Sequence, residues 1–342
     1  MKAQALYNPA NEHDACGVGL VANINNVASH QIVLQGITVL KRLMHRGAAG
    51  GDPETGDGAG LLLSMPHKFF RKIYSDLPER YGVAMVFVDN SVAADSYDEK
   101  IKELAAAEGC PVVKIREVPV DPKAIGRTAR ETLPHIRQYF FDGSAVAVSA
   151  QDKEGEEFNP FELKLFVLRR QIEKACESVY ICSCSSRTIV YKGLLLAIQI
   201  EAFYKDLNDV DFESPIALVH QRYSTNTFPT WPLAHPFRYL AHNGEINTLR
   251  GNLNSLKARE PHLKSERFGE DLQKLLPLIS AGQSDSASLD NMFELLVAAG
   301  RSLPHAILMM MPQAWGAKHY MGRDVRGFFE YESMLMEPWD GP

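Results

Sequence analysis

The apolar positions along the chain follow two different spacings. Short runs in which every residue or every second residue is apolar predict strands at 16–25, 61–64, 81–88, 111–120, 136–142, 145–150, 216–225 and 237–242. Apolar residues at helical spacing predict helices at 31–45, 66–75, 94–108, 247–259, 269–276 and 286–299. Because strands and helices are interspersed along the whole chain, the pattern predicts a mixed α and β fold.

The middle of the chain carries finer predictions. The strands and helices between 81 and 177 predict an inserted α+β subdomain. Residues 179–183 and 188–191 predict a hairpin that turns at 185–187. Pro277 predicts the end of the helix before it. A further strand is predicted by alternating apolar residues at Phe161, Leu163, Leu165 and Val167. A helix is expected to follow it, up to residue 177.

Composition and charge exclude several classes of protein. With 342 residues, 45% hydrophobic and 23% charged, the chain can bury the core of a globular protein. A net charge of −6 argues against a nucleic-acid or anionic-membrane partner, and no apolar run reaches the roughly 20 residues of a membrane span. Five cysteines without framework spacing, and no secretory signal, predict a cytoplasmic protein.

One cysteine stands where an N-terminal nucleophile would stand. Cys16 follows a polar leader of fifteen residues and begins an apolar run. Cleavage of the Ala15–Cys16 bond would give the thiol its own α-amino group as a base, one known way to activate a weak nucleophile. Residues 1–15 would then be a propeptide. Two other interpretations are a small buried hydrophobic residue and a lipoprotein cleavage site, although the leader lacks the apolar segment that the latter requires.

Three polar clusters in the second half carry candidate chemistry. Arg222 follows the apolar run 216–219, and its planar guanidinium can hold a carboxylate through two hydrogen bonds, although a surface salt bridge is the simpler role. Asn243 and Gly244 can aim a side-chain amide and a backbone N–H at one oxyanion, or form a plain hairpin turn. Asp285 can bind an ammonium group, or it can cap a helix together with Ser284.

Other candidate sites have weaker support. The glycine-rich loop 56–60 leads into a strand and lacks the Lys-Ser/Thr of a phosphate-binding loop. Cys182 and Cys184 have no second pair at metal-ligand spacing. The histidines show no HExxH arrangement, and we interpret them as structural imidazoles: His13, His45, His220, His235 and His242.

Several motifs, in order along the chain, resemble the class II glutamine amidotransferase domain of glutamate synthase large subunits. The match covers nearly the whole chain, so we expect one such domain at 16–342. The motifs are Cys16-Gly17-Val18-Gly19, Leu43-Met44-His45-Arg46-Gly47-Ala48, Thr55-Gly56-Asp57-Gly58-Ala59-Gly60, Gln221-Arg222-Tyr223-Ser224-Thr225, Ala241-His242-Asn243-Gly244-Glu245-Ile246-Asn247 and Ser284-Asp285-Ser286-Ala287.

The resemblance implies a fold and a set of site residues. The fold is the four-layer α-β-β-α sandwich of N-terminal-nucleophile hydrolases. Cys16 matches the nucleophile, and Asn243 with Gly244 matches the oxyanion hole. Arg222 and Asp285 match the residues that bind the α-carboxylate and α-ammonium of glutamine. Arg46 matches an arginine near the nucleophile that orders the site.

The resemblance also implies an activity and partners. The expected reaction is hydrolysis of L-glutamine to L-glutamate and ammonia, with ammonia passed to synthase domains, in the same polypeptide or a separate subunit, that bind FMN and an iron–sulfur cluster. We expect no cofactor or metal in this chain itself, and a small electron-donating subunit is a further expected partner. NADPH, NADH and ferredoxin all remain open as electron donors. Turn residues at the end of the chain (Pro338, Asp340, Gly341 and Pro342) lead us to expect that the domain continues beyond it, truncated here at its C-terminal end.

Two alternatives remain at this point. One is another N-terminal-nucleophile amidase or amidotransferase that acts on a different amide. The other is a non-catalytic regulatory or binding remnant, against which the joint presence of Cys16, Arg222, Asn243, Gly244 and Asp285 argues.

Overall fold

The protein is described here from a computed structural model. The structure describes residues 17–147, 159–222, 228–242, 244, 246–280, 282–313 and 320–339. Its strands are β1 (Val18–Ala22), β2 (Ala59–Ser64), β3 (Tyr81–Val88), β4 (Val112–Glu117), β5 (His135–Asp142), β6 (Val179–Ser185), β7 (Thr188–Gly193) and β8 (Ile216–Gln221).

These strands form two antiparallel sheets of four strands each. The strand order is β1-β8-β2-β7 in the first sheet and β4-β5-β3-β6 in the second. β3 shows how the second sheet is packed, because its side chains alternate between two cores. Val83, Met85 and Phe87 share one core with β2, β7 and β8, whereas Ala84, Val86 and Val88 face a second core that contains helix residues.

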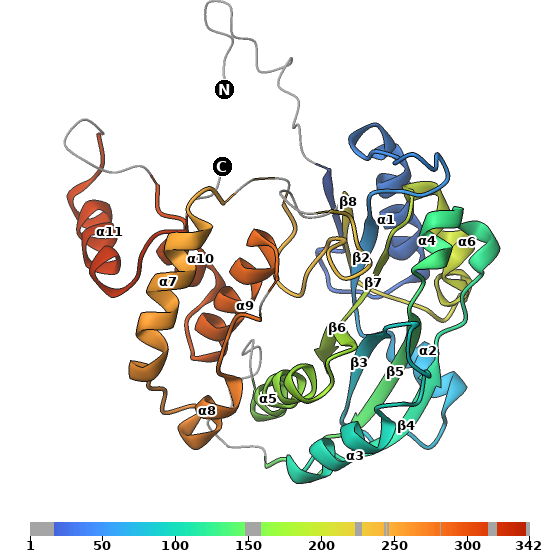
Figure 1. Ribbon diagram of the computed structural model, residues 1–342, viewed down its shortest axis with the longest axis horizontal. Coiled ribbons are helices and arrows are strands. Elements are labelled where there is room, and N and C mark those ends of the chain that lie inside the picture. Colours follow the sequence, from blue (N-terminus) through green and yellow to red (C-terminus); the bar gives the residue numbers. More distant parts are fainter. Residues whose placement is uncertain are drawn as a thin grey trace, which may run out of the picture.

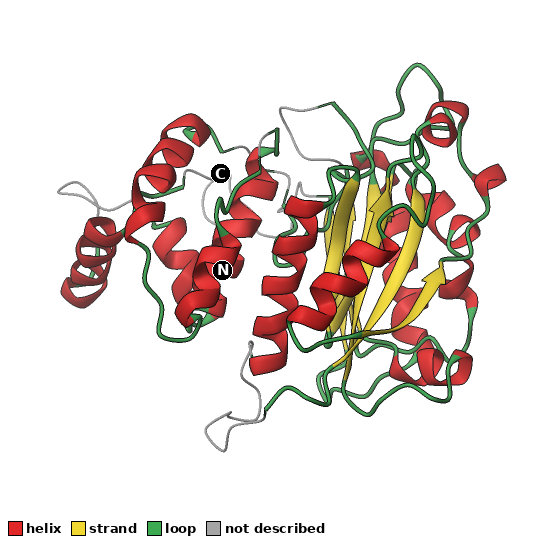
Figure 2. Ribbon diagram, turned by 60° about the horizontal axis from the view of Figure 1, so that its bottom comes forward, coloured by secondary structure: helices red, strands yellow, loops and turns green. Residues whose placement is uncertain are grey.

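Helices cover the outer faces of both sheets (Figures 1 and 2). α1 (His30–Arg42) packs on β8 of the first sheet. It lies close, since a Cβ atom on Gly36 would stand 2.6 Å from the Cβ atom of Ala217. α3 (Asp98–Ala107) and α5 (Pro160–Ala175) supply Ile101 and Leu168 to the core under the second sheet. The expected four-layer α-β-β-α sandwich is therefore confirmed.

A group of helices follows the sandwich in sequence and lies beside it in Figure 1, coloured orange to red. Phe166 and Val167 of α5 join its apolar core, which contains Leu289 and Met292 of α9. α5 therefore packs against both the second sheet and the helical group. The remaining helices are α2 (His67–Ile73), α4 (Arg127–Glu131), α6 (Ile200–Phe203), α7 (Leu249–Arg259), α8 (Leu272–Leu275), α9 (Asp285–Ala298), α10 (Leu303–Met310) and α11 (Arg323–Leu335).

The strand predicted at 161–167 is wrong, because these residues belong to α5. Asn159 caps this helix by accepting a hydrogen bond from the backbone N–H of Glu162, and Pro160 occupies its first turn. Two faces of α5 are buried, one in each neighbouring core, so apolar residues fall at many positions of the helix. The resulting alternation imitates a strand.

The predicted hairpin is also wrong, because β6 belongs to the second sheet and β7 to the first. The buried carboxylate of Glu162 accepts hydrogen bonds from the backbone N–H of Ser186 at 2.7 Å and from the hydroxyl of Ser185 at 2.9 Å. Burial raises the pKa of Glu162. The hydrogen-bond donors of residues 185 and 186 thus bind the Glu162 side chain of α5, and the chain crosses here from the second sheet to the first.

Two other strand predictions fail. Residues 237–242 form no strand: the N–H of Tyr239 donates to Asp290 Oδ1 of α9 at 2.8 Å, and the N–H of Phe237 donates to the carbonyl of Leu240 at 2.9 Å. Residues 145–147 lie in a turn, and 148–150 lie outside the described residues. The segment 81–177 supplies β3, β4 and β5 to the second sheet beside β6; that it forms a separable subdomain stays a prediction.

A buried lysine links the two sheets to the segment that follows β8. The ammonium of Lys192 donates to the hydroxyl of Tyr180 at 3.0 Å and to the carbonyl of Pro232 at 2.8 Å. It also lies 4.5 Å from the centre of the Phe237 ring. Lys192 is fully buried, and this desolvation lowers its pKa to about 8.

Lys192 should therefore make stability depend on pH. The unfolded lysine, with the higher pKa, binds more protons than the folded one between pH 8 and 10.5, so the free energy of unfolding should rise with pH. We expect Lys192→Met to remove about 2–3 kcal/mol of this rise between pH 7 and 10, measured by urea denaturation. Lys205→Met, at an exposed lysine, is the control and should follow the wild type. Parallel curves for wild type and Lys192→Met would contradict the assignment.

Candidate active site

The last residue of β8 lies between two segments that are remote in sequence. The N–H of Gln221 donates to the carbonyl of Gly17 at 2.8 Å, and Ala59 at the start of β2 pairs with Gln221 on the other side. Gly17 directly follows Cys16, and Arg222 directly follows Gln221. The strand register therefore brings the neighbour of the predicted nucleophile next to the neighbour of the predicted carboxylate-binding arginine.

Arg46 reaches the same end of the sheet through its neighbour. Arg46 ends a short 3₁₀ turn, Met44–Arg46, and Gly47 follows it. A Cβ atom on Gly47 would lie 2.1 Å from Nε2 of Gln221. This close approach places the backbone beside Arg46 against the side chain of Gln221 at the end of β8.

Arg222 has a strained backbone and a buried counter-charge. Its φ angle is 148°, which is costly for a residue with a side chain and is found most often at functional sites. Its Nε atom lies 3.9 Å from Oδ2 of Asp57. Asp57 is only 5% exposed, whereas the Arg222 side chain is 43% exposed. Burial raises the pKa of Asp57, although the Ala48 amide and Arg222 act in the opposite direction.

The predicted oxyanion donor is connected to β8 by histidines. Nε2 of His220, on β8, lies 3.0 Å from the carbonyl oxygen of His242, so this nitrogen is the donor. The backbone N–H of Gly244 donates to Nδ1 of His242 at 2.9 Å. His235 stacks on His220 with ring centres 4.4 Å apart and meets His242 edge-on at 5.7 Å. Gly244 is thus held near the end of β8.

Asp285 contacts the backbone two residues after Gly244. It opens α9, where Ser284 forms the N-cap by accepting a hydrogen bond from the N–H of Ala287 at 3.1 Å. The carboxylate of Asp285 is 2% exposed and accepts a hydrogen bond from the N–H of Ile246 at 3.1 Å. Ser284 is therefore the N-cap, and the carboxylate of Asp285 also accepts a hydrogen bond from the N–H of Ser286 in the first turn, at 2.6 Å.

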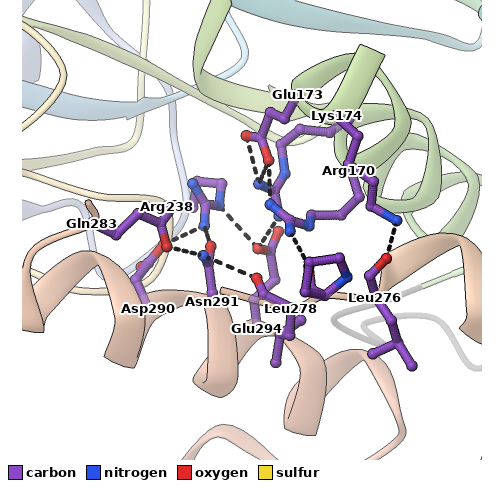
Figure 3. Close-up of polar contacts among 12 residues, drawn as sticks. Arg170, Glu173, Lys174, Arg238, Leu276, Leu278, Gln283, Asp290, Asn291 and Glu294 are labelled. Atoms are coloured by element: carbon purple, nitrogen blue, oxygen red, sulfur yellow. Dashed lines mark hydrogen bonds and ion pairs between the residues drawn. The ribbon is translucent and has the colours of Figure 1, made fainter. Parts of the chain in front are cut away.

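A buried ionic network holds α9 in place (Figure 3). Arg238 donates from Nε to Glu294 at 2.9 Å and from Nη2 to Asn291 at 2.5 Å, and it pairs with Asp290 at 2.8 Å. Glu294 also pairs with Arg169 of α5. The network joins the segment before Gly244 to the helix that carries Asp285.

Two of the predicted site residues, Cys16 and Asn243, lie outside the described residues. The structure brings together the neighbourhoods of the other four: Arg46, Arg222, Gly244 and Asp285. Sequence reasoning missed the contacts of His220 and His242, and it assigned no role to Asp57. Two sequence features could have indicated them: a histidine stands directly before Asn243, and one acidic residue stands inside the glycine-rich loop 56–60.

Within the described ranges, no group of three or more His, Cys, Asp or Glu side chains is placed to hold a metal ion. Cys182 and Cys184 are unpaired thiols on β6, and burial raises the pKa of both. No helix in these ranges has the length and apolar character needed to cross a membrane.

Comparison with known proteins agrees with the motifs. Residues 16–342 match the family of glutamine amidotransferases class-II, and the match begins at Cys16. The chain is 50% identical to the glutamate synthase [NADPH] large chain of Bacillus subtilis, with all of this chain and 22% of that protein aligned. It is 43% identical to the corresponding chain of Azospirillum brasilense, over 98% of this chain and 22% of that protein.

A plant protein shows the same partial match. The ferredoxin-dependent glutamate synthase 1 of Arabidopsis thaliana is 38% identical over 98% of this chain and 21% of its own length. The chain thus spans about a fifth of the length of these relatives. On the strength of the match from Cys16 to the last residue, the chain belongs to the class II glutamine amidotransferases.

Proposed function

We propose that the chain hydrolyses L-glutamine to L-glutamate and ammonia. The observation that carries this proposal is a pair of contacts on one segment: His220, two residues before Arg222, donates to the carbonyl of His242, and Asp285 accepts from the N–H of Ile246. The strand end that leads to Arg222 and the carboxylate of Asp285 therefore both meet the segment that contains Gly244. Glutamine carries an α-carboxylate, an α-ammonium and a side-chain amide. Arg222 would bind the carboxylate and Asp285 the ammonium, which leaves the amide to face Gly244 and the start of β1.

The chemistry would begin at Cys16 after removal of residues 1–15. The α-amino group takes the thiol proton, and the thiolate attacks the amide carbon. The side-chain amide of Asn243 and the N–H of Gly244 stabilise the resulting oxyanion. Ammonia leaves with a proton, and water hydrolyses the thioester to release glutamate and restore the thiol. The start of the family match at Cys16 supports an N-terminal position for this residue.

Arg46 would order the site, not react in it. The contact between Gly47 and Gln221 supports this role, because it holds the Arg46 backbone near the end of β8. Arg222 would begin the reaction cycle facing Asp57, which keeps its guanidinium close to the site before the substrate carboxylate arrives.

In the complete enzyme, the ammonia would pass to synthase domains that make glutamate. We assign no cofactor to this chain and place FMN and the iron–sulfur cluster in the synthase domains. The names of the relatives include NADPH and ferredoxin. We therefore assign the choice of electron donor, and the binding of a small electron-donating subunit, to residues outside this chain. The free thiols of Cys110, Cys176, Cys182 and Cys184 support a reducing cytosol as its compartment.

Two other functions would give different results in one assay. A related amidase would hydrolyse another amide faster than glutamine. A regulatory remnant would bind glutamine without releasing ammonia. Ammonia release from glutamine, asparagine and simple amides, measured side by side, separates these functions.

Removal of the leader should be required for activity. We expect the intact mass of active enzyme to correspond to a chain that starts at Cys16. Cys16→Ala should abolish ammonia release but leave glutamine binding measurable by calorimetry, because the charged groups that bind the substrate are unchanged. Full activity in a chain that retains Met1–Ala15 would disprove the proposed nucleophile.

The charge of Asp57 should lower stability and support glutamine binding. Asp57→Asn removes the counter-charge of Arg222, and we expect KM for glutamine to rise roughly twofold to fivefold, as for a partly exposed ion pair. Because burial raises the folded pKa of Asp57, its charge costs stability at pH 7 and costs none below the unfolded pKa. Asp57→Asn should therefore raise Tm at pH 7 and leave it unchanged near pH 3.

Asp52, in the same loop, is the matched control. Hydrogen bonds from the N–H of Thr128 and the hydroxyl of Thr55 lower its pKa. Asp52→Asn should thus lower Tm at pH 7, with the loss disappearing as pH falls through the folded pKa. Equal Tm changes for the two variants would refute this assignment.

Asp285 should recognise the ammonium of glutamine. Asp285→Asn should reduce kcat/KM for glutamine at least roughly 30-fold, equivalent to about 2 kcal/mol for a broken buried charge pair. A glutamine analogue without the α-amino group should be a poor substrate for the wild type and should be little affected by Asp285→Asn. Equal losses for both substrates would show that Asp285 does not bind the ammonium.

A further inference from the structure

The amide proposed to stabilise the oxyanion already has an acceptor. The N–H of Gly244 donates to Nδ1 of His242 at 2.9 Å. A nitrogen that accepts this bond carries no proton, so the His242 ring is neutral, with its proton on Nε2. Burial lowers the pKa of His242 and favours the same neutral state.

The backbone on the other side of residue 243 is fixed. His220 donates from Nε2 to the carbonyl oxygen of His242 at 3.0 Å. His220 is fully buried and stacks on His235, which is also fully buried. The carbonyl of His242 is therefore anchored to β8, whereas the N–H of Gly244 donates to the ring of His242.

One N–H group makes one strong hydrogen bond at a time. The Gly244 amide must leave His242 before it can bind an oxyanion. We propose that His242 is a positioning residue that holds the Gly244 amide in the resting enzyme and releases it to the oxyanion. This inference rests on the proposed function, because it takes the Gly244 N–H as an oxyanion donor.

The exchange favours the transition state over the substrate. A negatively charged oxygen accepts a hydrogen bond about twice as strong as a neutral acceptor does. The oxyanion can therefore displace the imidazole, whereas the neutral carbonyl of bound glutamine gains little by doing so. In the empty site the bond to His242 also keeps a backbone donor satisfied. The donor thus becomes available as charge develops on the oxygen.

Removal of the acceptor tests this role. His242→Phe keeps an aromatic ring against His235 but offers no acceptor to Gly244. The free amide can then bind the glutamine carbonyl as well as the oxyanion. We expect KM to fall and kcat/KM to rise roughly fivefold, the equivalent of one neutral hydrogen bond that no longer has to be broken, with little change in kcat.

Two variants in the same mature enzyme sharpen the test. The side-chain oxygen in His242→Asn can accept from an N–H two residues ahead, as in an Asx turn, so its KM should lie closer to the wild-type value. His262→Phe, at an exposed histidine outside the site, is the control for ring replacement. A lower kcat in His242→Phe with no fall in KM would overturn the proposal.

A measurement on the unmodified site guards against misfolding of the variant. ¹⁵N-histidine NMR of the wild type should show the Nδ1 resonance of His242 shifting when the γ-aldehyde analogue of glutamine forms a tetrahedral adduct with the thiol, but not when glutamate binds. An unchanged resonance with the adduct would overturn the role of His242. Mature enzyme that releases no ammonia from glutamine would instead count against the proposed function.

Discussion

The site depends on the pairing of β8 between β1 and β2. The ladder joins Val18 to His220 and Ala59 to Gln221, so segments remote in sequence meet at the same end of the sheet. A shift of one residue in this register would turn Arg222 to the opposite face of the sheet. Close contacts at Gly36 and Gly47 hold α1 and the Arg46 turn against the same strand.

A second constraint is the ionic network around Arg238. Its charges are buried, and buried ion pairs contribute little net stability because each charge must first lose its hydration. The network instead determines how the elements that it joins are placed against one another. Through Asp290 and Glu294 it fixes α9 against the segment before Gly244, and through Arg169 against α5. The helix that carries Asp285 is thereby joined to the segment that leads to Gly244.

The sequence correctly predicted those elements whose apolar pattern matches the burial of their side chains in the fold. The strand at 81–88 has the predicted bounds, because both of its faces are buried and its residues favour strands. The apolar pattern gave the wrong element where tertiary contacts determine the structure. α5 was predicted as a strand because it is buried on two faces. The crossing from β6 to β7 was predicted as a hairpin because its stabilisation by Glu162 is not visible in the pattern. The charged residues proposed for the site, Arg222 and Asp285, were predicted from residue type and motif order, and their roles stay predictions. The contact between His242 and Gly244 could not, because it depends on the loop conformation.

The most direct test of the account is covalent labelling of the mature enzyme with a diazoketone analogue of glutamine, which alkylates a thiolate held beside the bound amide. Peptide mass spectrometry should find one adduct, on the peptide that begins at Cys16. Glutamine should protect against it, and both Arg222→Leu and Asp285→Asn should slow it at a fixed analogue concentration. An adduct on Cys110, Cys176, Cys182 or Cys184, or labelling of Cys16 that glutamine does not slow, would contradict the account.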